Sequence, residues 1–175
     1  MTGSRKLALL SIFLGCALIV GIVERSIPFD FFVPGVKLGL ANVVILTAIY
    51  TFKFHEALIL VVLKCVMISF FTGTFTSFIY SITGSLFSFF AMILLIIALK
   101  DKISPVGVSV VGAVFHNLGQ ITAASLVMRT MLVIAYLPIL LISGVITGIL
   151  VGIAVNGMLK VVRRQYDRYF STDSR

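Results

Sequence analysis

The chain has 175 residues, of which 60% are apolar and 11% are charged, and its formal net charge is +8. Soluble domains are usually about 45–50% apolar and about 25% charged, so this composition excludes an ordinary water-soluble fold. In a soluble protein the positive charge would indicate nucleic-acid binding, but in a membrane protein it is the expected excess of basic residues in cytoplasmic loops. We therefore expect membrane lipid, and no nucleic acid, around the chain.

Charged and turn-forming residues divide the apolar sequence into six segments. Continuous apolar runs of about fifteen or more residues are typical of membrane helices and not of barrel strands. The sequence therefore predicts an all-α integral membrane protein, a compact single-domain bundle of six transmembrane helices. The predicted spans are about 7–23, 38–52, 57–72, 76–99, 105–128 and 131–160, and a tail at 161–175 extends the last helix.

The basic residues are distributed unevenly between the two predicted ends of the bundle. An even number of spans places both termini on one side, and that side holds most of the Lys and Arg residues. The positive-inside rule therefore predicts that both termini are cytoplasmic. The basic residues assigned to this side are Arg5, Lys6, Lys53, Lys100, Lys102, Lys160, Arg163, Arg164, Arg168 and Arg175.

The first span carries a strip of small residues at helical spacing, Ala8, Ser11 and Gly15. Small side chains let another helix approach closely, so the strip is a candidate docking face for a partner. A cleaved signal peptide is disfavoured because no small-x-small cleavage site precedes the charged pair Glu24 and Arg25.

The segment between the first two spans is rich in proline and phenylalanine and leads to Lys37 and Asn42. This composition predicts a structured lid on the outer side, and an interfacial loop is the alternative. With Arg25 and Arg129 on the same side, Lys37 would give the site a positive potential. An anionic ligand with a flat or greasy part fits such a site best.

Lys64 lies near the middle of the third span, in the stretch LVVLKCV. A charge at this depth costs about 2.5–3.5 kcal/mol even on lenient insertion scales, so Lys64 must face the bundle interior. Two interpretations stay open with equal weight: Lys64 pairs with a buried carboxylate, for which Glu24 and Glu56 are the candidates, or it contacts an anionic ligand.

The fifth span carries His116, Asn117 and Gln120 within about one helical turn. We favour a ligand-lining face over a contact that only joins two helices, because helix packing rarely needs three such groups together. The sixth span carries a ridge formed by Gly144, Gly148 and Gly152, which is expected to pack inside the bundle.

The sequence lacks the usual patterns of catalysis and metal binding. It shows no nucleotide loop, no Ser-His-Asp arrangement and no paired acidic motif, and the six acidic residues are scattered. The two cysteines, Cys16 and Cys65, lie inside apolar runs. We therefore expect no enzymatic activity, no cofactor and no metal site.

Two motifs, PGVKLGLAN at 34–42 and GVSVVGAVFHNLGQ at 107–120, resemble the family named both Gx transporter and heptaprenyl diphosphate synthase component I. That family is similar to the substrate-binding S components of energy-coupling factor (ECF) transporters, which are six-helix proteins of the bacterial cytoplasmic membrane. The resemblance runs from the first span to the sixth.

The resemblance implies a multi-pass membrane protein that binds a small molecule from outside, beneath the loop after the first span. The implied ligand residues are Lys37, Asn42, Lys64, His116, Asn117 and Gln120. It also implies docking of the first helix on a transmembrane T subunit coupled to two ABC ATPases, although Ser11 and Gly15 stand where S components carry alanine.

Three functions follow from this resemblance. The first is an S-component-like transporter subunit for a flavin or a related anionic aromatic or isoprenoid compound. The second is an accessory membrane subunit linked to prenyl diphosphate and quinone synthesis, as the family's older name suggests. The third is a membrane subunit of a flavin-based extracellular electron-transfer chain.

Overall fold

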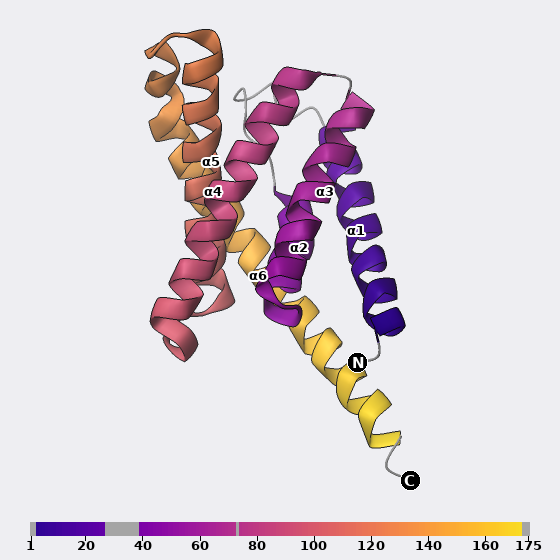
Figure 1. The fold of residues 1–175 in the computed structure, drawn as a ribbon. Helices are drawn as coiled ribbons and strands as arrows, with labels where there is room; N and C mark the ends of the chain where they lie inside the picture. Colours follow the sequence, from indigo (N-terminus) through magenta and orange to yellow (C-terminus); the bar gives the residue numbers. More distant parts are fainter. Residues whose placement is uncertain (1–2, 27–38, 73, 173–175) are drawn as a thin grey trace.

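The computed structural model describes residues 3–26, 39–72 and 74–172, and within them the chain forms six α-helices (Figure 1). The all-α fold predicted from the sequence is confirmed. The helices are α1 (Gly3–Ser26), α2 (Leu40–Thr51), α3 (Phe54–Thr72), α4 (Phe75–Leu99), α5 (Pro105–Met128) and α6 (Leu137–Thr172), with short 3-10 turns η2 (Lys100–Lys102) and η3 (Leu132–Tyr136).

Five of the described helices, all except α2, are long and apolar enough to cross a membrane. The helix α2 has 12 residues, a length of about 18 Å, whereas the hydrocarbon core of a bilayer is about 30 Å thick. Most of α2 is buried by its neighbours. The structure therefore supports five candidate spans, and α2 is a short core helix instead of a sixth complete span.

The helices α2 to α6 form a ring of neighbours, and α1 packs on the outside of this ring against α2 and α3 (Figure 1). The helices α4, α5 and α6 pack closely in series, while α3 contacts α4 and α2 contacts α6. Each helix of the ring contributes at least one large apolar side chain that is less than 2% exposed: Leu46, Val61, Phe89, Val108 and Val155. The apolar core therefore lies within the ring.

Local signals in the sequence explain where two of the helices begin. Ser104 precedes α5, and its hydroxyl accepts a hydrogen bond from the backbone N–H of Gly107 at 3.3 Å, with Pro105 in the first helical position. At the start of α3, the carboxylate of Glu56 accepts the backbone N–H of Lys53 at 3.1 Å, which is half of a capping box.

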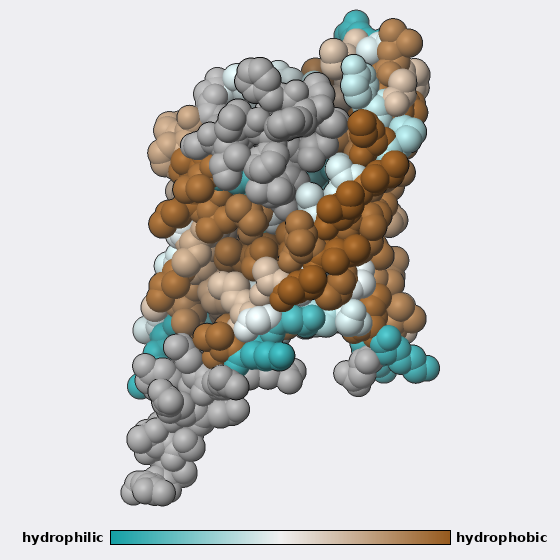
Figure 2. All heavy atoms as spheres, turned by 180° about the vertical axis from the view of Figure 1, so that it is seen from behind, coloured by the Kyte–Doolittle hydropathy of each residue, from teal (hydrophilic) through white to brown (hydrophobic). Residues whose placement is uncertain are grey.

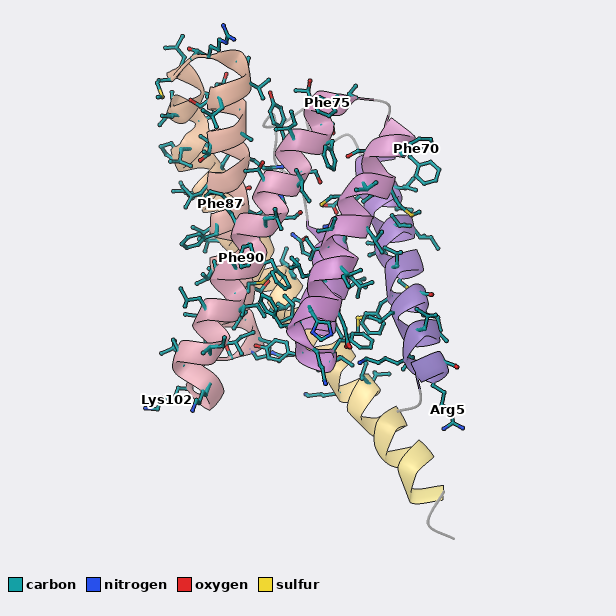
Figure 3. The ribbon with its side chains drawn as sticks, in the orientation of Figure 1. Arg5, Phe70, Phe75, Phe87, Phe90 and Lys102 are labelled. Atoms are coloured by element: carbon teal, nitrogen blue, oxygen red, sulfur yellow. The ribbon has the colours of Figure 1, made fainter. Side chains whose placement is uncertain are left out.

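The surface is a broad apolar band between hydrophilic ends, as Figure 2 shows for one face of the molecule. Arg5 and Lys102 lie at one end of the bundle, and Phe70 and Phe75 lie at the other (Figure 3). At the basic end, Lys6 of α1 forms an ion pair with Glu56 of α3. Such an apolar band is typical of a protein that is surrounded by lipid.

The glycine ridge of α6 packs directly against α5, as predicted. A Cβ atom at Gly148 would lie 2.7 Å from Cα of Val110 and 3.2 Å from the carbonyl oxygen of Ser109. Because both neighbours are backbone atoms, they cannot move away without displacing the helix. The missing side chains therefore set the close spacing of α5 and α6.

We expect Gly148→Ala to lower the free energy of unfolding by about 1–3 kcal/mol, because the added methyl group collides with the α5 backbone. Gly157→Ala is the matched control on the same helix, since a Cβ atom there meets nothing within 4 Å. Alanine is the better helix former, so this control should be neutral or more stable by up to about 1 kcal/mol. Denaturation of the purified protein in mixed micelles measures both changes, and equal changes would contradict the packing argument.

Candidate functional site

The helix α2 begins inside the bundle, well short of the ends of its neighbours α1 and α3 (Figure 1). Its first turn follows Gly39, whose φ of 74° lies in the left-handed region that favours glycine. The first N–H groups of any helix lack partners within that helix. In a bundle surrounded by lipid, these N–H groups must find partners within the protein.

Glu24 provides the partner for this helix start. Its carboxylate accepts hydrogen bonds from the backbone N–H of Gly39 and, at 3.5 Å, from that of Ala41. The positive end of the α2 dipole also favours a negative charge at this position. Glu24 therefore joins the C-terminal end of α1 to the beginning of α2.

Lys64 of α3 lies against the same first turn of α2. The residue is 5% exposed, and its Nζ atom lies 3.5 Å from Oδ1 of Asn42. Both carboxylates proposed as partners from the sequence are engaged elsewhere: Glu24 caps α2 and Glu56 pairs with Lys6. Among the residues that the structure describes, Lys64 forms no ion pair. Of the two interpretations left open by the sequence, pairing with Glu24 or Glu56 is therefore not observed.

Next to Lys64, a group of small polar side chains joins α3 to α4. Sγ of Cys65 lies 3.4 Å from Oγ of Ser85 and 3.7 Å from the carbonyl oxygen of Ser81. The sequence analysis did not identify these residues. Ser81 and Ser85 stand four residues apart in α4, so both fall on the same helix face. That spacing is a signal that could have identified them.

The polar residues of α5 face two different neighbours. A Cβ atom at Gly84 of α4 would lie 2.8 Å from Cγ of Gln120 and 3.1 Å from Cε1 of His116, so both side chains lie over this glycine. The Nδ2 group of Asn117 instead donates a hydrogen bond to the carbonyl oxygen of Leu140 in α6 at 2.5 Å. Asn117 therefore joins α5 to α6, while His116 and Gln120 lie against α4.

Together these groups form a polar layer across the middle of the bundle. At this level, polar contacts join α2 to α3, α3 to α4 and α5 to α6. Polar side chains of α5 also lie against α4. The layer consists of Asn42, Lys64, Cys65, Ser81, Ser85, His116, Asn117 and Gln120. Lys37 and the segment predicted to form a lid lie outside the described residues.

The polar layer offers one cation, three amides, an imidazole and several hydroxyl or thiol groups. This chemistry suits the recognition of an anion by charge and hydrogen bonds. In the described ranges, no group of three His, Cys, Asp or Glu residues is placed to hold a metal ion. The arrangement therefore favours binding of a ligand by the side chains themselves.

The family model of heptaprenyl diphosphate synthase component I matches residues 13–158, which include the whole polar layer. Because this match covers most of the chain, the protein belongs to the heptaprenyl diphosphate synthase component I family. The resemblance found in the sequence is thereby confirmed. No curated protein and no solved structure matches the chain.

We expect Asn117→Ala to lower the free energy of unfolding by about 1 kcal/mol, a usual value for a hydrogen bond between membrane helices. Gln120→Ala is the control one turn further along α5, since no hydrogen bond is observed from Gln120 to the described residues. The control should change stability less. Denaturation in mixed micelles measures both values, and the reverse order would contradict the assigned role of Asn117.

Proposed function

We propose that this membrane protein of the heptaprenyl diphosphate synthase component I family is the substrate-binding component of a small-molecule transporter. In this proposal the protein is not an enzyme, and the polar layer binds an anionic ligand. A flavin or a related anionic aromatic or isoprenoid compound fits the apolar surroundings. The observation that carries the proposal is the burial of Lys64 without a carboxylate partner among the described residues.

A buried cation without a counter-ion destabilises a protein, because removing its hydration is not offset by a Coulomb attraction. The hydrogen bond observed from Lys64 to the described residues, to Oδ1 of Asn42 at 3.5 Å, is to a neutral amide and is long. An anionic ligand would supply the missing negative charge. Its apolar part would then be surrounded by the side chains of the ring.

The outer face of α1 supports a partner of the kind that S components use. Ala8 and Ser11 are exposed, and a Cβ atom at Gly15 would meet nothing within 4 Å. We propose that this face docks on a transmembrane T subunit coupled to ABC ATPases. In the bacterial cytoplasmic membrane, the basic end of the bundle, with both termini, would face the cytoplasm.

The name of the family favours a second candidate, an accessory membrane subunit of heptaprenyl diphosphate synthase. The same layer would then hold the diphosphate of an isoprenoid. A role in a flavin-based extracellular electron-transfer chain is a third candidate. Purified protein with flavin absorbance would favour the first or third function, whereas colourless protein that stimulates a soluble prenyl synthase would favour the second.

Lys64→Met tests the ligand site, because methionine retains much of the side-chain length without the charge. Mass spectrometry of gently purified protein should detect a retained anionic small molecule in the unchanged protein and none in this variant. The ligand-free variant should be as stable as the unchanged protein or more stable, since a buried charge has been removed.

Lys53→Met is the matched control, because Lys53 is exposed at the end of the bundle. It should retain the same molecule as the unchanged protein. If Lys64→Met keeps the molecule, or loses it only together with its folding, the proposed role of Lys64 is wrong.

Gly15→Leu tests the docking face. The larger side chain extends into open space, so we expect normal folding and ligand retention but loss of co-purification with the T subunit. Gly157→Leu is the control, because a Cβ atom there also meets nothing within 4 Å and the residue is on α6. Equal co-purification of both variants would contradict docking through α1.

A further inference from the structure

Two opposite charges flank the first turn of α2 without pairing with each other. The carboxylate of Glu24 binds the N–H groups of Gly39 and Ala41, and Lys64 contacts Asn42 in the same turn. Glu24 and Lys64 form no ion pair, although both are described. Two groups at this turn therefore attract negative charge: the backbone N–H groups at the helix start, which Glu24 binds, and the ammonium group of Lys64.

The side chain of Asn42 lies between Lys64 and the backbone at Gly39. Its Oδ1 faces Lys64, while its Nδ2 lies 3.5 Å from the position of a Cβ atom at Gly39. The amide N–H groups therefore lie beside the backbone N–H that Glu24 occupies. Backbone N–H groups, an amide and an ammonium group within one turn are the donor types that bind carboxylate and phosphate groups.

Glu24 is poorly placed with respect to its own helix. It lies in the last turn of α1, which ends at Ser26, and the C-terminal end of a helix disfavours a negative charge. The residue is only half-buried. The carboxylate is held in this position by its hydrogen bonds to the start of α2, and α1 itself does not stabilise it there.

We infer that the first turn of α2, together with Asn42 and Lys64, binds the carboxylate or phosphate group of the ligand, and that Glu24 is its internal competitor. In the ligand-free protein Glu24 satisfies the N–H groups of Gly39 and Ala41. The incoming anionic group displaces this carboxylate and also gains the contacts with Asn42 and Lys64. This inference rests on the proposed binding function and adds the position and the regulation of the anion site.

The test is rescue of a Glu24→Ala variant by an added anion. The variant leaves the start of α2 without its partner, so its melting temperature should fall in a phosphate-free buffer. Inorganic phosphate, used as the probe, should raise the melting temperature of the variant more than that of the unchanged protein. The phosphate concentration for half of the effect should be about tenfold lower in the variant, the value of one charge-assisted hydrogen bond.

Further variants keep the test decisive. Glu24→Gln retains an oxygen acceptor but loses the charge, so it should fold even where Glu24→Ala does not, and it should show the same direction of change. Adding Lys64→Met to either variant should remove most of the rescue. Gly148→Ala is the control: it is destabilised by a collision with the α5 backbone and uncovers no helix start, so phosphate should not rescue it.

Loss of stability in Glu24→Ala without rescue by phosphate would overturn the inference, because it would show a purely structural cap. The inference would also be overturned if phosphate changed the melting temperature of none of the variants. Nanodiscs of zwitterionic lipid, with and without added anionic lipid, separate the sources of the anion, and rescue only by anionic lipid would contradict a soluble ligand. The proposed function is tested separately, by whether the purified protein retains a small molecule that Lys64→Met loses. The proposed function and this inference can therefore fail independently.

Discussion

The start of α2 at mid-depth in the bundle is the constraint on which the rest of the structure depends. A helix that begins within the apolar region exposes N–H groups that lipid cannot satisfy. Here the partner is the carboxylate of Glu24, which arrives from the end of α1. Within the described residues α1 packs mainly against α2 and α3, so this bond is one of the interactions that fix α1 in place.

The early start of α2 also explains why polar side chains gather at one level. A short helix leaves its positive end next to α3, where the amide of Asn42 faces Lys64. Around the remainder of the ring, glycine allows helices to approach closely enough for polar contacts to form between them. Gly84 and Gly119 bring α4 and α5 together, so that His116 and Gln120 lie directly against α4. The polar layer is thus a consequence of one short helix and of close backbone packing.

Much of this arrangement follows from the sequence, because apolar length and charge position act locally. The apolar segments predicted six helices, and the position of Lys64 within an apolar run predicted its burial. The predicted span at 38–52 places the start of α2 within two residues of Leu40. The depth at which α2 begins could not be predicted, because it depends on how the neighbouring helices pack against it. Glu24 contacts α2, and Asn117 and His116 contact different helices. These contacts depend on which helices are neighbours, and helical spacing alone does not determine that.

The proposed anion site and the proposed docking face are connected physically through α1, because Glu24 reaches the site from this helix. Glu24 lies in the last turn of α1, and Ser11 and Gly15 lie on the same helix. Since a helix transmits displacement along its axis as a nearly rigid body, release of Glu24 from α2 would loosen α1 as a whole. A ligand that binds more tightly when Glu24 is released from α2 shifts the population toward this released form. The size of the shift is limited by the difference between the ligand's affinities for the two forms. Occupancy of the site would then reach the partner through α1 itself, without a separate relay through the other five helices.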